Sequence, residues 1–152
     1  MRLVRVLAVD FGEKRIGLAV SDEAGRVVVP VGALERESDE KAAAAVAQAA
    51  RERNVARLVV GLPRSSGGTE GLFARRARNF ARRLSDASGL PVDLHDETLT
   101  SAAADDALDD AGVSARSRLG ARGHKRARTG ARDAEAAAVL LRDWLSAHGE
   151  GP

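Results

Sequence analysis

The residues of this chain best suited to chemistry are carboxylates at the ends of apolar segments. Asp10 closes an apolar run at residues 3–10, Asp96 and Glu97 follow a later apolar run, and Asp133 stands at the start of a helical pattern. Carboxylate oxygens are the ligands that hard divalent cations prefer in proteins. These acids therefore make a divalent-metal site one interpretation of the sequence.

The geometry of an α/β sheet allows two of these acids to meet. If the strands before Asp10 and Glu97 run parallel, both residues emerge at the same sheet edge, where open α/β sheets bind ligands. Two strand spacings are about 10 Å, which side chains reaching inward can bridge through a metal or a metal pair. An Asp before a Gly turn and an Asp at a helix N-cap are also ordinary structural residues. Spacing alone leaves both interpretations open.

Composition excludes several other classes of site. The chain has no Cys, which removes disulfide frameworks, zinc fingers and cysteine nucleophiles. It contains no G-x-G-x-x-G, P-loop, H-E-x-x-H or G-x-S-x-G motif, and its three His show no metal-ligand spacing. No apolar run approaches the roughly 18 residues of a membrane-spanning helix. We expect a cytoplasmic protein.

Charge is segregated along the chain although the total is nearly balanced. Lys and Arg number 24 against 22 Asp and Glu, for a net charge of +2. Residues 114–132 hold seven basic side chains and no acid, and residues 64–83 hold six Arg against Glu70 alone. The first segment favours contact with phosphates. For the arginines at 75–83, a phosphate-binding helix and a solvated helix face are equally good interpretations.

Hydrophobic periodicity predicts one α/β domain at residues 1–147, with a disordered tail at 148–152. An antiparallel three-strand start is followed by strands alternating with helices, which requires a parallel part of the sheet. Pro30 places the third strand at an edge or a bulge, and the basic residues 112–132 are expected to form a long loop. The expected strands are 3–10, 16–22, 27–34, 57–62 and 91–95, and the expected helices are 38–54, 71–88, 100–111 and 133–147.

Four segments resemble one known family. Residues 8–22 (AVDFGEKRIGLAVSD), 59–71 (VVGLPRSSGGTEG), 95–101 (HDETLTS) and 132–145 (RDAEAAAVLLRDWL) resemble, in order, the motifs of the YqgF family. These RNase H-like proteins are similar to Holliday-junction resolvases and are named as pre-16S rRNA nucleases. The resemblance covers nearly the whole chain.

The resemblance implies a fold, an activity and a catalytic set. The fold is an RNase H-like five-stranded mixed sheet in the order 3-2-1-4-5, with helices on both faces. The activity is that of a hydrolase acting on phosphodiester bonds, a nuclease for 5′-end processing of pre-16S rRNA in ribosome biogenesis. Asp10, Glu97 and Asp133 become the catalytic acids that hold Mg²⁺ or Mn²⁺.

The expected partner is nucleic acid, with RNA favoured and structured DNA as an option, together with pre-ribosomal particles. We expect a monomer or homodimer and no membrane partner. Two positions depart from the family pattern: Thr98 stands where Arg is usual, and Arg132 where Val or Ile is usual. Arg64 or Arg132 can replace the missing charge. The candidate nucleic-acid contacts are Lys14, Arg15, Arg64, Arg116, Arg118, Arg122, Lys125, Arg126, Arg128 and Arg132.

Other functions remain open at the level of sequence. One is a Holliday-junction-resolvase-like DNA nuclease, and another is a non-catalytic RNA-binding factor of ribosome assembly, in which the acids would be structural. An actin-like ATPase has a similar phosphate loop, but that fold needs two such domains, more than 152 residues supply.

Overall fold

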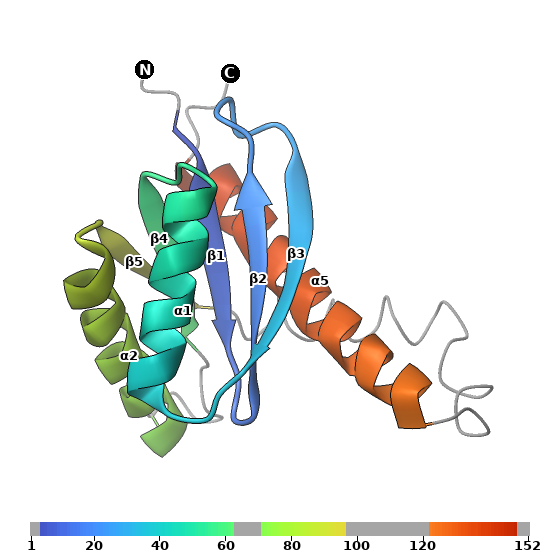
Figure 1. Ribbon diagram of the computed structural model, residues 1–152. Helices are drawn as coiled ribbons and strands as arrows, with labels where there is room; N and C mark the ends of the chain where they lie inside the picture. The colour runs from blue at the N-terminus through green and yellow to red at the C-terminus, as the bar shows by residue number, and fades with distance from the viewer. Residues whose placement is uncertain (1–3, 63–70, 97–121, 149–152) are drawn as a thin grey trace.

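The fold is a five-stranded mixed sheet with helices on both faces (Figure 1). The structure is a computed structural model and describes residues 4–62, 71–96 and 122–148, with only the backbone path at 96 and 122–129. Its strands are β1 (Val6–Phe11), β2 (Arg15–Ser21), β3 (Val28–Glu35), β4 (Arg57–Leu62) and β5 (Val92–Asp96). Its helices are α1 (Asp39–Glu52), α2 (Leu72–Ser88) and α5 (Arg122–His148).

The predicted strand order is confirmed. The sheet runs β3-β2-β1-β4-β5, with β1, β2 and β3 antiparallel and β1, β4 and β5 parallel. Pro30 meets both of its predicted constraints, because β3 is an edge strand and pairs irregularly: Gly32 opposes Leu18 and Pro30 opposes Ala19, which leaves Val31 as the extra residue.

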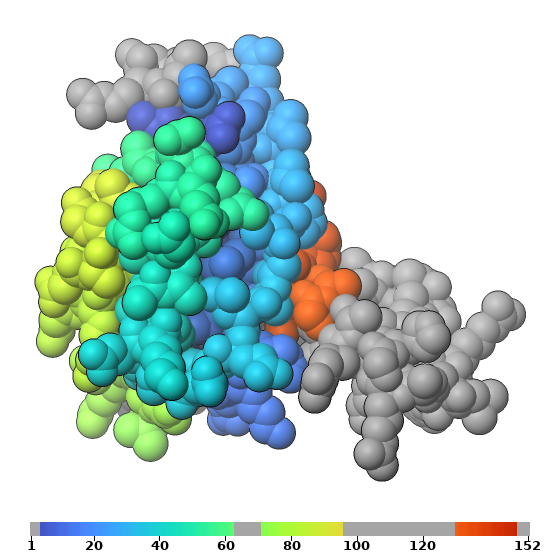
Figure 2. Space-filling view, in the orientation of Figure 1, coloured from blue at the N-terminus to red at the C-terminus, as the bar shows by residue number. Residues whose placement is uncertain are grey.

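The two faces of the sheet bury different helices. Leu7, Val9 and Phe11 of β1 pack with α1 and α2, while Val6 and Ala8 pack with α5. This alternation follows from the two-residue period of a strand. Figure 2 shows α1 and α2 over one face, β3 along the margin, and α5 emerging behind it.

Helix ends follow the local sequence signals. The Ser38 side chain accepts a hydrogen bond from the Lys41 backbone N–H at 3.1 Å and caps α1. α2 ends at Gly89, whose φ of 72° lies in the left-handed region that glycine adopts without strain. Within the described ranges, no helix is long and apolar enough to cross a bilayer.

The turn between β2 and β3 is closed by Asp22. Its carboxylate accepts backbone N–H groups of Val27 and Arg26 at 3.1 and 2.8 Å. The hydrogen bond from Val27, followed by that from Arg26, holds the pKa of Asp22 below its ordinary value because both favour the ionised form.

The C-terminal third differs from the sequence-based prediction. The last helix was expected to begin at Asp133, but α5 begins at Arg122, so Asp133 lies inside the helix and is not its N-cap. The prediction of a loop at 112–132 is thus wrong for residues 122–132, which belong to α5. Ala and Arg are good helix formers, so the helix begins well before Asp133. His148 was assigned to the tail but is the last residue of α5, where its Nδ1 lies 3.1 Å from the Trp144 carbonyl oxygen. The expected helix at 100–111 falls outside the described residues.

Candidate active site

The candidate site begins with Asp10 near the carboxyl end of β1. Asp10 follows Val6 and Ala8 in the strand alternation, which places it on the face covered by α5. It stands directly opposite Gly17 of β2 in the antiparallel ladder. Directly opposed residues project to the same face of a sheet. Asp10 therefore shares its surroundings with whatever covers Gly17.

What covers Gly17 is the backbone of Asp133. A Cβ built on Gly17 would collide with the carbonyl oxygen of Asp133, so only a glycine lets α5 approach β2 this closely. The approach brings Asp133, which is far from Asp10 in the chain, to the same place on the sheet. Two of the three predicted catalytic acids thus lie together at the end of β1.

An arginine pairs with one of these two acids. The Nε of Arg15 donates to Oδ2 of Asp133 at 2.8 Å, and both side chains are partly exposed, 35% and 24%. At this exposure the ion pair adds on the order of 1 kcal/mol or less to stability. Its larger effect is to fix the orientation of the Asp133 carboxylate. Sequence reasoning placed Arg15 in a turn against a phosphate, whereas it is the first residue of β2; Lys14 lies in the turn and is exposed.

The strand end of β5 contributes a histidine. Val9 pairs with Val60 of β4, and Val60 pairs with Leu94 of β5, so these three residues form one row across the sheet. Asp10 and His95 each follow a member of that row by one residue. The Nε2 of His95 lies 2.6 Å from Oδ2 of Asp143 on α5. His95 is therefore on the face of Asp10, at the same level and about two strand spacings, or roughly 10 Å, away.

Sequence reasoning missed this histidine. It found no histidine in a position to serve the site, because Asp143 is 48 residues away from His95 and no local motif links them. The alternation of side chains along β5 was the one available signal that His95 shares a face with Asp10. Using that signal required knowing which face of the sheet α5 covers.

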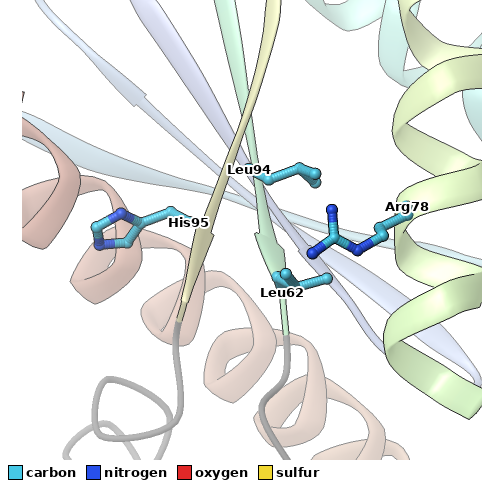
Figure 3. Close-up of a pocket in the computed structure, with 4 residues that line it drawn as sticks. All are labelled: Leu62, Arg78, Leu94 and His95. Carbon is cyan, nitrogen blue, oxygen red and sulfur yellow. The ribbon is translucent and has the colours of Figure 1, made fainter. Parts of the chain in front are cut away.

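A depression of about 370 Å³ opens beside the same strand ends. It is lined by Leu62, Arg78, Leu94 and His95. Figure 3 shows His95 directed towards α5, while Leu94, Leu62 and the guanidinium of Arg78 lie on the α2 side. The depression thus lies at the ends of β4 and β5, with three of its four lining residues on the α2 side.

The other predicted site residues divide by position. Arg132 is exposed on α5 next to Asp133. Glu97, Arg64, Arg116 and Arg118 lie outside the described residues. Four more basic residues belong to the first turns of α5, where only the backbone is described: Arg122, Lys125, Arg126 and Arg128.

Among the described residues, no group of three or more His, Asp or Glu side chains is arranged to hold a metal ion. Asp10 and Asp133 would offer two carboxylates to a metal ion, which would need further ligands from outside this pair. The chemistry of the pair, hard oxygen donors with a cation beside them, fits a divalent metal and a phosphate better than an apolar ligand.

Comparison with known proteins agrees with this geometry. A family described as "RuvX: Holliday junction resolvase" matches residues 4–147. A protein of Anaeromyxobacter dehalogenans (strain 2CP-C), named "Putative pre-16S rRNA nuclease", is 47% identical over 142 residues, 93% of this chain and 96% of that protein. A protein of the same name from Chloroflexus aurantiacus (strain ATCC 29366 / DSM 635 / J-10-fl) is 37% identical over 97% of this chain and 90% of its own length.

Solved structures of low sequence identity share the fold. Thermus thermophilus RuvC in complex with a Holliday junction substrate superposes with a TM-score of 0.57 at 16% identity, over 97% of each chain. The fowlpox virus Holliday junction resolvase gives 0.54 at 13% identity, over 94% of this chain and 98% of that one. The sheet order, the family match over residues 4–147 and the identities of 37–47% place the chain in the RuvX family, the YqgF family that its motifs resemble.

Proposed function

We propose that this chain is a metal-dependent nuclease that hydrolyses phosphodiester bonds at the 5′ end of pre-16S rRNA, in the cytoplasm and on pre-ribosomal particles. The observation that carries the proposal is the meeting of Asp10 and Asp133 at the carboxyl end of β1, beside Arg15. The names of the curated relatives favour the rRNA substrate.

The proposed metal ligands are Asp10, Asp133 and Glu97. Leu94 and His95 lie on opposite faces of β5, with His95 on the face of Asp10. Continued alternation favours Glu97 over Asp96 as the third ligand. Mg²⁺ or Mn²⁺, when bound, activates water for attack and offsets the charge that develops on the phosphate and the leaving oxygen.

The protein's own groups hold and position the reactants. Asp10 and Asp133 keep two carboxylates on one face, and the Arg15 guanidinium pairs with the Asp133 carboxylate. Arg15, which contacts Asp133, and its exposed neighbour Lys14 would contact a phosphate once substrate arrives, and Arg15 suits a bidentate contact. The basic residues of 116–132 would bind the backbone of the substrate further from the reacting bond.

A second candidate is a DNA nuclease that resolves four-way junctions. It is favoured by the description of the family itself. The same acids would serve, because a metal-carboxylate site acts on the phosphodiester and not on the base. The two candidates differ only in the shape of the nucleic acid that the surrounding surface accepts.

One experiment separates these functions. The purified chain is incubated with a 5′-extended 16S RNA, an unrelated structured RNA and a four-way DNA junction, each with Mg²⁺, Mn²⁺ or EDTA. Cleavage of the 16S precursor that EDTA abolishes supports the proposal. Preferred cleavage of the junction supports the second candidate. Tight RNA binding without cleavage in either metal would overturn both and leave a non-catalytic assembly factor.

A further inference from the structure

α2 presents an unusual concentration of positive charge. Its 17 residues include a single acid, Asp86, and five arginines: Arg75, Arg76, Arg78, Arg82 and Arg83. Arg76 lies over the ring of Phe73, with 5.9 Å between the guanidinium carbon and the ring centroid. Arg75, Arg82 and Arg83 are exposed and form no ion pair with any other residue that the structure describes. Most of this charge is therefore left for an external partner.

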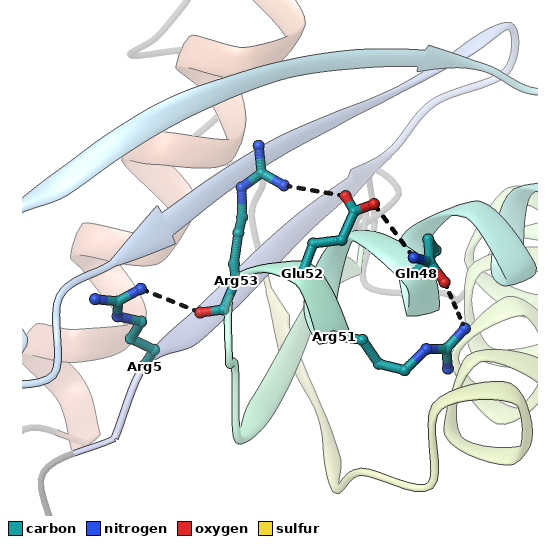
Figure 4. A network of polar contacts seen from close by, with 5 residues as sticks. All are labelled: Arg5, Gln48, Arg51, Glu52 and Arg53. Atoms are coloured by element: carbon teal, nitrogen blue, oxygen red, sulfur yellow. Dashed lines mark hydrogen bonds and ion pairs between the residues drawn. The ribbon is translucent and has the colours of Figure 1, made fainter.

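The neighbouring helix α1 shows what a neutralised surface looks like in this molecule. Its sequence contains three acids and two bases, and its C-terminal turn forms a chain of polar contacts (Figure 4). Arg51 donates to Gln48 at 3.0 Å, Gln48 donates to Glu52 at 3.2 Å, and Glu52 lies 4.0 Å from Arg53. α1 and α2 pack side by side on the same face of the sheet. A difference in their position in the fold therefore does not explain the difference in their charge.

Position links this charge to the candidate site. Arg75, Arg78 and Arg82 follow the i, i+3, i+7 spacing of one helical stripe. The stripe spans about 10 Å along the axis at 1.5 Å per residue, roughly three phosphates at 3.4 Å per nucleotide in a duplex strand. Arg78 lines the depression that reaches His95 at the end of β5.

The chemistry fits a phosphate backbone. Guanidinium groups match phosphate oxygens with paired hydrogen bonds. Base stacking needs exposed aromatic rings, but Phe80 is fully buried and Phe73 is half-buried on α2. The surface can neutralise phosphates but offers no exposed aromatic ring on which bases could stack.

We propose that the arginine face of α2, namely Arg75, Arg76, Arg78, Arg82 and Arg83, is a second nucleic-acid-binding surface, which guides the substrate backbone over the ends of β4 and β5 to the acids. It rests on the proposed nuclease function for the identity of the substrate. It holds RNA mainly through the phosphate backbone and acts together with the basic segment at 116–132.

The test compares two variants of equal charge change. One carries Arg75→Gln, Arg78→Gln and Arg82→Gln on α2. The control carries Lys41→Gln, Arg51→Gln and Arg53→Gln, which removes three charges on and next to α1. Binding of a labelled single-stranded RNA is measured in EDTA over a series of NaCl concentrations, so that no cleavage interferes.

We expect the α2 variant to lower the slope of log K against log salt by up to about 2, at about 0.7 for each phosphate of a single strand that the protein neutralises. The control should stay close to wild type. A third variant with Lys at the three α2 positions should regain the salt slope, because it restores the charge, and only part of the affinity, because Lys lacks the paired donors.

Three outcomes would overturn the proposal. The α2 and α1 variants could weaken RNA binding equally, or the α2 variant could leave the salt slope unchanged. The third is that the wild-type protein binds poly-glutamate as tightly as it binds RNA. The nuclease function is judged separately by the cleavage assay. A protein that cleaves while its α2 variant binds normally refutes this surface alone, and a protein that never cleaves but binds RNA through α2 refutes the nuclease alone.

Discussion

The two faces of the sheet differ most at the ends of the strands. Under α5, the strand ends carry Asp10, Arg15 and His95, with Asp133 and Asp143 of the helix against them. Under α1 and α2, the apolar core continues to the same edge, where Phe11 packs against Phe80 with ring centroids 4.8 Å apart. One face positions polar groups, and the other supplies most of the buried apolar surface.

The difference assigns separate tasks to the two faces. Substitutions at the strand ends under α5 should change chemistry with little effect on stability, because these side chains are partly exposed. Substitutions under α1 and α2 should change stability with little effect on the chemistry of the molecules that remain folded. Each prediction below tests that division.

The largest effect is expected from Asp10→Asn. It removes one negative ligand from the proposed metal site, and loss of a single preorganised electrostatic group commonly lowers a rate by about 10²–10³-fold. Stability without metal should stay level or rise slightly, because the charge repulsion with Asp133 disappears. Cleavage rate and urea unfolding, measured on the same preparation, check both parts; full activity of the pure variant would end the catalytic interpretation of Asp10.

Glu97→Gln should behave like Asp10→Asn, and Asp96→Asn should cost much less activity. The two neighbours belong to opposite sides of an extended chain. The matched pair of variants is assayed for cleavage and for Mn²⁺ affinity. An inactive Asp96→Asn beside an active Glu97→Gln would shift the proposed ligand by one residue.

On the opposite face, Phe80→Ala should lower the free energy of unfolding by about 3–5 kcal/mol, the usual cost of emptying a buried aromatic site. Phe80 is fully buried between Phe11 and the rest of the α1 and α2 core. Urea unfolding measures the decrease. Activity per folded molecule should remain near wild type, and a large fall in kcat under conditions where the protein is folded would contradict the division of tasks.

Gly17→Ala should affect both properties, because it lies where the fold and the site meet. The new methyl group would collide with the Asp133 carbonyl oxygen and push α5 away from β2. Overpacking of this kind costs about 1–3 kcal/mol, and displacement of Asp133 should weaken Mn²⁺ binding, measured by calorimetry. Gly32→Ala is a suitable control, since its surroundings are open, although its φ of 142° adds backbone strain. Unchanged metal binding in Gly17→Ala would mean that α5 accommodates the methyl group.

The smallest effect on turnover is expected from the basic segment near the start of α5. The variant replaces four arginines with Gln: Arg116, Arg118, Arg122 and Arg126. The slope of log K against log salt should fall by about 0.7–0.9 for each phosphate that the variant no longer neutralises. The value of kcat at saturating substrate should change little, because such interactions hold ground state and transition state alike. An unchanged slope would leave the α2 surface as the main path of the substrate.

Sequence reasoning succeeded where the signal is local or periodic. The antiparallel start and the parallel part of the sheet followed from the three-strand start and the later alternation of strands and helices, and the full strand order from the family resemblance. The N-cap of α1 followed from Ser38, and the edge position of β3 from Pro30. It failed at the start of α5, where an acidic residue in front of an apolar run was interpreted as a cap. A helix with a basic first half gives no amphipathic signal there, and the apolar pattern begins only at Ala134, the first buried residue of α5 among those whose side chains the structure describes.

The sequence by itself determined the fold class and the family and supplied the candidate acids, because apolar periodicity and contiguous motifs are properties of short stretches of chain. Only the tertiary structure decided how those residues meet. The approach of α5 to β2 depends on the missing side chain of Gly17, and it pairs Asp133 with Arg15 across 118 residues and His95 with Asp143 across 48. Such pairs are set by the crossing of a helix over a sheet, a relation between distant segments that no local spacing encodes.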